Sequence, residues 1–350
     1  MTVKQSITIQ QALSKLISGS GLTRDEARAV MSMIMNGEAT SSQIGAVATA
    51  LRMKGESKEE ITGFAEVMRQ YSSHVATSQA GLLDTCGTGG SGIHKFNIST
   101  ASSIIAAAAG IRVAKHGNRA MSGKSGSADV LEALGVDINL TPQQAADCLA
   151  SIGICFMFAQ LYHPSLKYAA APRRELGVRT IFNMLGPLTN PAGADRQLLG
   201  LYDRSRTETI ASVLQELGLA RALVVSSHDG LDEISISAAT QISELKDGKV
   251  YTYHLEPEQL GLRRYSIQDV IGGDAGENAG LITEVFTGQR RDAYRDIVLA
   301  NAGACIYVGG KADTLQAGVE IAAEVIDSGK ASEKLQELIV RTGELNHVSG

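Results

Sequence analysis

Long apolar runs are absent from this 350-residue sequence, and none approaches the length of about 18 residues that a membrane-spanning helix requires. The first residues also lack a positively charged stretch followed by an apolar one, which is the pattern of a secretory signal. Positive charge is not in excess, because the formal net charge is −5, and this argues against general attraction to nucleic acid or to anionic lipid. We therefore expect a cytoplasmic protein with no nucleic acid and no membrane among its partners.

Cysteine is scarce, and its spacing matches neither a disulfide framework nor a zinc site. The four cysteines show no C-x-x-C pattern and no histidine at ligand spacing. They are Cys86, Cys148, Cys155 and Cys305. We expect free, mostly buried thiols, as in a cytoplasmic protein. Tryptophan is missing altogether, which has no bearing on function.

The first 75 residues carry helix signals and no strand pattern. Thr23, Thr40 and Ser57 each precede a glutamate or glutamine by three residues, and each opens a segment with apolar residues three and four positions apart. Together with the segment from Thr8 to Leu16, these capping boxes predict four short helices. Apolar positions on the third helix, such as Met53, fit either a core or a subunit contact, and periodicity does not separate the two.

After Asp84 the pattern changes to alternating strands and helices. We predict strands over residues 111–114, 154–158, 198–202 and 222–226, and helices over residues 101–109, 165–176 and 210–217. Asp247-Gly248 between two further apolar runs indicates a hairpin. The predicted fold class is α/β, with a small all-helical domain over residues 1–75 and a larger α/β domain over residues 76–350. The larger domain is expected to hold a central mixed, mostly parallel sheet flanked by helices.

Three loops between residues 84 and 132 are rich in glycine, hydroxyl groups or cations. They begin with Asp-Thr-Cys-Gly-Thr-Gly-Gly-Ser-Gly at Asp84, Asn-Ile-Ser-Thr at Asn97 and Lys-His-Gly-Asn-Arg-Ala at Lys115. Glycine lets backbone N–H groups approach an anion closely. Ser99 and Thr100 begin a predicted helix, whose free N–H groups favour negative charge. So many donors predict a ligand that carries several phosphate groups.

Two common nucleotide motifs fit this stretch poorly. Gly87, Gly89 and Gly92 match G-x-G-x-x-G, but the acidic residue expected about 20 positions later is missing, since the next strand ends in Lys115. The Walker pattern fails on spacing, because Asn118 stands where it requires glycine. Neither a nicotinamide dinucleotide nor a Walker-type nucleotide site is favoured.

Asp232 and Glu233 follow an apolar strand and the turn Asp229-Gly230, so they too are expected at the carboxyl end of a strand. Adjacent carboxylates in an extended loop point in different directions and can reach two cations that share a phosphate ligand. Mg²⁺ is typically held by one or two carboxylates together with substrate phosphate oxygens. Solvated loop acids are the more frequent interpretation of an arbitrary Asp-Glu pair.

Together these motifs resemble the anthranilate phosphoribosyltransferase family of tryptophan biosynthesis. The resemblance extends through Arg173, the run Phe-Asn-Met-Leu-Gly-Pro-Leu-Thr-Asn-Pro over residues 182–191 and the motif Asp-Gly-Leu-Asp-Glu over residues 229–233, and it covers essentially the whole chain. It implies transfer of the phosphoribosyl group of 5-phosphoribosyl 1-pyrophosphate to the amine of anthranilate, with release of pyrophosphate. It also implies two Mg²⁺ ions per active site with substrate bound, a homodimer formed through the helical domain, and helices near residues 166–190 that pack onto that domain.

The resemblance further implies the residues of each subsite. Anthranilate is expected on Gly87, Asn118 and Arg173, whose guanidinium suits a planar carboxylate. Magnesium is expected on Ser99, Asp232 and Glu233. The residues expected to bind phosphoribosyl pyrophosphate are Gly87, Gly90, Ser91, Lys95, Asn97, Ile98, Ser99, Thr100, Lys115, His116, Gly117, Asn118, Arg119, Ala120, Met121, Ser122, Gly123 and Ser127. His116 is a candidate general base, although a histidine beside a phosphate loop more often positions a ligand.

Two positions depart from the family pattern. Many members have aspartate where this chain has Ser91, and Lys95 replaces a common threonine. One negative charge is removed and one positive charge is added beside the expected pyrophosphate. We expect a modestly altered response to pyrophosphate and magnesium, without loss of activity.

Two other functions on the same architecture stay open. A pyrimidine nucleoside phosphorylase would use inorganic phosphate and would not need Asp232 and Glu233. A nucleic-acid-binding relative would require a basic surface, against which the intact loops and the negative net charge argue.

Overall fold

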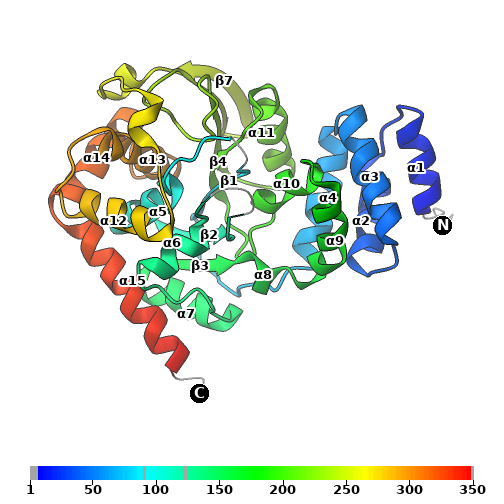
Figure 1. Ribbon diagram of the computed structural model, residues 1–350, viewed down its shortest axis with the longest axis horizontal. Coiled ribbons are helices and arrows are strands. Elements are labelled where there is room, and N and C mark those ends of the chain that lie inside the picture. Colours follow the sequence, from blue (N-terminus) through cyan, green and yellow to red (C-terminus); the bar gives the residue numbers. More distant parts are fainter. Residues whose placement is uncertain (1–6, 90–91, 121–123, 348–350) are drawn as a thin grey trace.

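The computed structural model describes residues 7–89, 92–120 and 124–347, and its helices and strands form two neighbouring parts (Figure 1). The first part begins with α1 (Ile9–Ile17), α2 (Arg24–Met35), α3 (Ser41–Lys54) and α4 (Lys58–Gln70). Capping boxes are present at the start of all four helices, and three of them are the predicted ones at Thr23, Thr40 and Ser57. The predicted all-helical beginning of the chain is therefore confirmed.

Within the described residues, seven strands form one sheet in the order β3-β2-β1-β4-β5-β6-β7. The neighbours from β3 to β5 are parallel, and β6 and β7 are added antiparallel, so the mixed, mostly parallel sheet is confirmed. The strands are β1 (Leu82–Gly87), β2 (Arg112–Gly117), β3 (Ile154–Phe158), β4 (Arg196–Gly200), β5 (Arg221–Ser227), β6 (Thr240–Lys246) and β7 (Lys249–Leu255). Chain order reverses between β1 and β4, the place where open α/β sheets bind ligands.

Both faces of the sheet are buried over its parallel strands, and consecutive strand residues alternate between the two faces. Leu198 joins the core cluster that contains α5 (Ile98–Ala108) and α13 (Ala293–Val308). The next residue, Leu199, joins the cluster that contains α11 (Thr207–Glu216). Period-two alternation with helices on both faces is the pattern of an α/β sheet.

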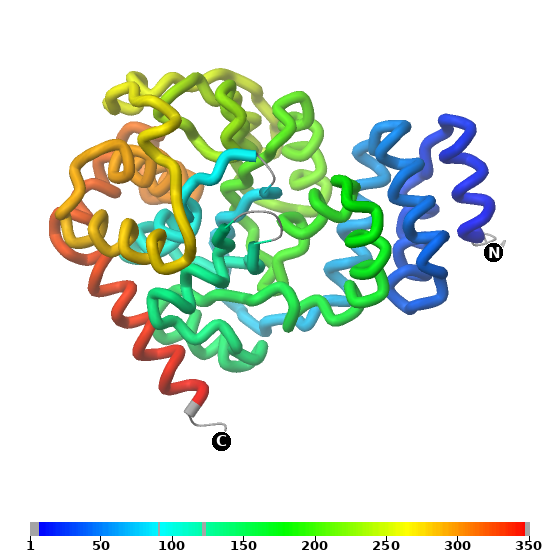
Figure 2. The backbone as a smooth tube through the Cα atoms, in the orientation of Figure 1, coloured from blue at the N-terminus to red at the C-terminus, as the bar shows by residue number. Residues whose placement is uncertain are grey.

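The remaining helices include two that return to the N-terminal part. They are α6 (Ser127–Ala133), α7 (Pro142–Ile152), α8 (Ala159–Tyr162), α9 (Lys167–Leu176), α10 (Ile181–Leu185), α12 (Ala275–Phe286), α14 (Leu315–Asp327) and α15 (Lys330–His347). α9 contacts α2 and α3, and α10 contacts α3 and α4, as the green segments beside the blue ones show (Figure 2). The domain boundary near residue 76 falls between α4 and β1 and stays a prediction. None of the helices in the described stretches is both long and apolar enough to cross a membrane.

Two predicted strand boundaries are corrected by two or three residues. The strand expected over residues 111–114 runs to Gly117, so Lys115 and His116 belong to β2 and do not begin a loop. The strand expected over residues 198–202 is shifted to 196–200, because polar Arg196 and Gln197 pair with neighbouring strands on both sides. All four cysteines are free, and only Cys86 is not fully buried, which confirms the expectation.

Candidate active site

The acidic pair and the described parts of the predicted loops lie at one edge of the sheet, where the parallel strands β1, β2, β4 and β5 end. Gly87, Gly117, Gly200 and Ser227 are the last residues of these strands. The loops that follow them carry the glycines, the hydroxyl groups and the two adjacent acids. The carboxyl edge of such a sheet, at the reversal of chain order, is the expected position for a ligand.

Asp232 and Glu233 are buried, and two strand-end glycines make room for the loop that carries them. A Cβ atom on Gly200 would lie 1.9 Å from the carbonyl oxygen of Asp232. A Cβ atom on Gly87 would lie 2.9 Å from Oδ2 of the same residue. Glycine is therefore required at the ends of β4 and β1 by the close approach of the acidic loop.

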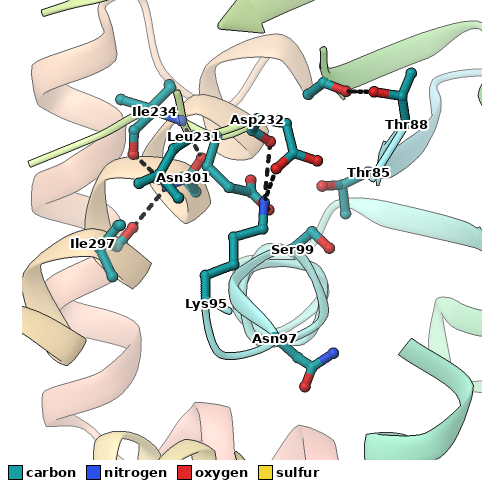
Figure 3. A network of polar contacts seen from close by, with 12 residues as sticks. Thr85, Thr88, Lys95, Asn97, Ser99, Leu231, Asp232, Ile234, Ile297 and Asn301 are labelled. Atoms are coloured by element: carbon teal, nitrogen blue, oxygen red, sulfur yellow. Dashed lines mark hydrogen bonds and ion pairs between the residues drawn. The ribbon is translucent and has the colours of Figure 1, made fainter. Parts of the chain in front are cut away.

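Two polar residues outside the predicted set hold this loop in place. Asn301 on α13 accepts a hydrogen bond from the Ile234 amide and donates to the Ile234 carbonyl, both at 2.9 Å (Figure 3). The carboxylate of Asp229 accepts hydrogen bonds from Ser227 at 2.5 Å and Ser235 at 2.6 Å. The sequence signal for Asn301 is a lone amide within the apolar run of residues 297–306 in α13. The signal for Asp229 is an acid flanked by several serines.

Lys95 lies between the two acids. Its Nζ atom donates to Oδ1 of Asp232 and Oε1 of Glu233, both at 2.8 Å, and to the Asp232 carbonyl oxygen at 3.3 Å (Figure 3). Burial alone would lower the pKa of Lys95, but the two carboxylates outweigh it and raise the pKa above its ordinary value. Lys95 is therefore a protonated ammonium in contact with the acidic pair.

The ammonium of Lys115 is buried and contacts protein groups. Its ammonium donates to the carbonyl of Thr85 and lies 3.4 Å from the hydroxyl of Ser99 at the start of α5. Burial lowers the pKa of Lys115, and the nearby charge of Asp84 opposes that shift. The predicted phosphate contact of Lys115 stays a prediction, and its observed partners give it a role in placing Ser99.

Asn97 connects the loop before α5 with two other segments. Its side-chain oxygen accepts hydrogen bonds from Ser125 Oγ at 3.1 Å and from Asn278 Nδ2 at 2.9 Å. Ser125 and Asn278 are additional site residues that the predicted set does not contain. Ile98 and Thr100 are fully buried residues, and their predicted contacts with phosphoribosyl pyrophosphate stay predictions.

The loop after β2 is closed by Asp129 on α6. Its carboxylate accepts hydrogen bonds from the backbone amides of Ala120 at 2.9 Å and Gly126 at 2.8 Å. Arg119 forms ion pairs with Asp129 and Glu132, so its charge is already shared with two acids. The predicted contacts of Arg119 and Ala120 with a phosphate stay predictions.

Three further members of the predicted set contact one another or lie close by. The side chain of Asn118 accepts a hydrogen bond from the Arg119 amide at 2.8 Å, and Ser127 Oγ donates to the Asn118 carbonyl at 3.3 Å. Gly117 is packed so tightly that a Cβ atom would lie 2.2 Å from Ser127 Oγ. The predicted residues Gly90, Ser91, Met121, Ser122 and Gly123 lie outside the described residues.

His116 is a buried, neutral imidazole. The residue is 5 % exposed, and its ring lies edge-on to the ring of His163, with 5.0 Å between the ring centres. Burial, helped by His163, lowers the pKa of His116 to about 3. A group with so low a pKa is a weak base at neutral pH, so the burial of His116 argues against proton transfer.

The two buried histidines predict acid sensitivity. Burial lowers the pKa of His163 to about 4, while histidine in an unfolded chain has a pKa of about 6.5. The unfolded chain therefore binds more protons, and stability should fall as pH decreases from 6.5 towards 4, by roughly 2 kcal/mol per histidine at pH 5. Urea unfolding between pH 7 and pH 5 measures this slope. His163→Gln should flatten the slope, whereas a change at the exposed His254 should not; equal slopes for both variants would contradict the assignment.

Arg173 on α9 is partly buried and stacks on an aromatic ring. Its guanidinium lies 5.6 Å from the ring centre of Phe182. Within the described part of the chain no carboxylate forms an ion pair with it, and burial lowers its pKa. A partly desolvated guanidinium without a carboxylate partner is suited to bind an anionic ligand.

A divalent cation fits this edge only if a ligand supplies part of its coordination. No cluster of three or more histidine, cysteine, aspartate or glutamate side chains is placed to hold a metal in the described stretches. Asp232, Glu233 and Ser99 offer two carboxylates and one hydroxyl. Oxygen donors of this kind suit Mg²⁺, which usually completes its shell with water and substrate phosphate.

Comparison with known proteins agrees with this architecture along the whole chain. Residues 79–332 match the model of the glycosyl transferase family, a/b domain, and residues 10–72 match that of the glycosyl transferase family, helical bundle domain. The anthranilate phosphoribosyltransferase of Brevibacillus brevis is 54 % identical over 338 residues, which cover 97 % of this chain and 99 % of that protein. The chain belongs to the anthranilate phosphoribosyltransferase family.

Solved structures of the family share the fold. The anthranilate phosphoribosyltransferase of Thermus thermophilus superposes with a TM-score of 0.90 at 40 % identity, covering 95 % of this chain and 99 % of that one. The Saccharomyces cerevisiae enzyme, in complex with PRPP and Mg, has a TM-score of 0.86 at 25 % identity and covers 96 % and 98 %. The family assignment therefore agrees in sequence and in structure.

Proposed function

We propose that this chain transfers the phosphoribosyl group of 5-phosphoribosyl 1-pyrophosphate to the amine of anthranilate. The products are N-(5-phosphoribosyl)anthranilate and pyrophosphate, and the reaction belongs to tryptophan biosynthesis. The observation that carries the proposal is the meeting of the buried Asp232–Glu233 pair with the donor-rich loops and the start of α5 at one sheet edge. Membership of the anthranilate phosphoribosyltransferase family supports the same reaction.

The residues of this edge would orient the sugar ester and its leaving group. Backbone N–H groups of the glycine-rich loops and of the start of α5 would hold the diphosphate. Asp232, Glu233 and Ser99 would hold Mg²⁺, which supplies positive charge for the departing pyrophosphate. The bond from carbon 1 to the diphosphate oxygen breaks, with its electron pair leaving on pyrophosphate, and a bond from carbon 1 to the anthranilate nitrogen forms; this nitrogen then releases one proton to water. An aromatic amine is neutral at pH 7, so no residue has to deprotonate it before attack, and orientation and charge stabilisation should dominate the rate enhancement.

Two Mg²⁺ ions per active site are part of the proposal. Asp232 and Glu233 are adjacent in the chain, and both are buried at this edge. Two ions that share the diphosphate could therefore each take one carboxylate. Counting bound metal in the presence of phosphoribosyl pyrophosphate by elemental analysis would give the number directly.

We also propose a homodimer formed through the helical part. A groove of about 830 Å³ runs between α1, α3 and α9, and apolar residues including Leu16, Ala50 and Leu176 line it. Ile17 and Met53 beside it are 77 % and 83 % exposed. Exposed apolar side chains around such a groove favour burial against a second copy of the chain. Light scattering at micromolar concentration should give twice the chain mass.

The cytoplasm is the proposed location, and the four free thiols support it. Cys148, Cys155 and Cys305 are fully buried, and burial raises the pKa of each thiol. Such thiols suit a reducing compartment, where disulfides rarely form.

The decisive test of the function follows the loss of anthranilate fluorescence on addition of phosphoribosyl pyrophosphate. Fluorescence should fall with Mg²⁺ present and stay nearly constant when Mg²⁺ is chelated. Thermal stabilisation by phosphate plus a pyrimidine nucleoside, without any such fluorescence change, would instead support a nucleoside phosphorylase. Retention of single-stranded DNA on a filter at moderate salt would support the nucleic-acid-binding alternative.

Replacing Arg173 by alanine should weaken anthranilate binding selectively. Loss of charge-assisted hydrogen bonds to the carboxylate should raise the apparent KM for anthranilate by the equivalent of about 1–3 kcal/mol. The KM for phosphoribosyl pyrophosphate should change little. Arg174→Ala is the matched control, because Arg174 is the next residue on α9 and is exposed. An equal change in both variants would contradict the role of Arg173.

A further inference from the structure

The ammonium of Lys95 occupies a fixed position on the acidic pair. The Lys95 side chain is 17 % exposed, and those of Asp232 and Glu233 are 2 % and 6 % exposed. The backbone at this position is also anchored, because Lys95 forms an isolated antiparallel bridge with Ile271 and the amide of Gly272 donates to the His94 carbonyl at 2.7 Å. The contact therefore joins a backbone-anchored lysine to the buried acidic loop and is not made by a freely extended side chain on the surface.

All three N–H groups of the ammonium are directed at the acidic segment. Their acceptors are one carboxylate oxygen of Asp232, one of Glu233 and the Asp232 carbonyl. Two buried carboxylates without a compensating cation are strongly unfavourable, and Lys95 supplies one positive charge in direct contact. Lys115 acts on Glu233 only through its charge.

We propose that Lys95 is the resident cation of the Asp232–Glu233 pair and sets the affinity of this pair for divalent ions. The inference rests on the proposed function, in which the pair holds Mg²⁺. A divalent ion and the ammonium compete for the same oxygens and repel each other, so the substrate-free protein has low affinity for the ion. With Mg²⁺ held by Asp232 and Glu233, the Lys95 ammonium would be displaced from the carboxylates and could pair with the diphosphate instead. Metal binding and diphosphate binding are thereby coupled in this chain.

Manganese binding to the substrate-free protein tests the proposal without measuring activity. Electron paramagnetic resonance counts free Mn²⁺, and the comparison is between the wild type and Lys95→Met, which keeps most of the side-chain length and removes the charge. Lys95→Met should bind Mn²⁺ at least about tenfold more tightly, because the competing charge is gone. The double variant Lys95→Met/Glu233→Gln should bind weakly again. Lys311→Met is the matched control, because Lys311 is exposed and far from the acidic pair. It lies beside Gly110, which precedes β2, so it is at the amino edge of the parallel strands, opposite the candidate site.

Thermal unfolding gives a second test, and this test remains informative if Lys95→Met folds poorly. Lys95→Met leaves two buried acids uncompensated, so its Tm should drop without divalent ions and recover on addition of Mn²⁺, whereas the wild-type Tm should not respond. A Lys95→Met variant that folds only with Mn²⁺ would support the proposal. A variant whose Tm or folding gains nothing from Mn²⁺ would overturn it.

The failure of this inference is distinguishable from the failure of the proposed function. Equal Mn²⁺ affinity of the wild type and Lys95→Met without substrate overturns the role of Lys95 alone. Absence of protein-bound Mn²⁺ in every variant, even with phosphoribosyl pyrophosphate present, removes the metal site itself and the inference with it.

Discussion

Asp232→Asn and Glu233→Gln are each expected to lower kcat by about 10²-fold or more, while the protein stays folded. Each change removes one carboxylate from the proposed metal site and keeps the shape of the side chain. Stability should change little, because Lys95 keeps the other acid as a partner and two like charges no longer share a buried site. The assay is anthranilate fluorescence with saturating substrates, together with thermal unfolding of the same samples.

The control for these two variants is Glu256→Gln. Glu256 is an exposed acid that pairs with Arg264, so the same chemical change is made outside the site. Its kcat should equal that of the wild type. Full activity in both Asp232→Asn and Glu233→Gln would exclude the acidic pair from the reaction.

Gly200→Ala, at the end of β4, should displace the acidic loop and so lower activity. The added Cβ atom would lie 1.9 Å from the Asp232 carbonyl oxygen, so the acidic loop would have to shift by about 1 Å. A displacement of that size is expected to lower kcat by about 10²-fold. It should also cost about 1–3 kcal/mol of unfolding free energy. Activity and urea unfolding measure the two effects.

Gly280→Ala is the matched control for this substitution. Gly280 lies inside α12, where nothing lies within 4 Å of an added Cβ atom. Alanine is the better helix former, so this variant should keep its activity and gain up to about 1 kcal/mol. Wild-type activity in Gly200→Ala would show that the loop can relax away from β4 without consequence.

Local signals in the sequence predict the elements of this fold well. The capping boxes at Thr23, Thr40 and Ser57 begin helices where expected, because the side chain and backbone partners all lie within one turn. The apolar run at 154–158 is a buried strand with the predicted bounds. The α/β alternation also places the three loops at one sheet edge, since parallel strands end together.

The contacts that organise the site could not be predicted from local patterns. Lys95 meets Asp232 across 137 residues, and Asn301 meets Ile234 across 67. Nothing near Lys95 in the sequence indicates an acidic partner, and its position beside the glycine-rich loop predicts a contact with the diphosphate instead. The sequence predicts that Lys115 and His116 begin a loop, yet both lie in β2. There the Asp84 carboxylate accepts a hydrogen bond from the His116 amide, and the Thr85 carbonyl accepts one from the Lys115 ammonium. Polar strand residues of this kind are stabilised by tertiary partners that a sequence pattern does not contain.

Because α9 and α10 pack on the N-terminal helices, the chain cannot be cut between α4 and β1 into two independent fragments. Ala169 and Phe182 belong to the same core cluster as Val47 and Phe64, and that cluster continues onto β5 through Val224. A fragment that ended soon after α4 would expose the apolar surface that these returning helices cover. The N-terminal bundle is therefore not a transplantable module, and a chimaera between relatives would have to exchange it together with the segment that carries α9 and α10. Fusion partners and tags are better placed at the chain ends than between α4 and β1.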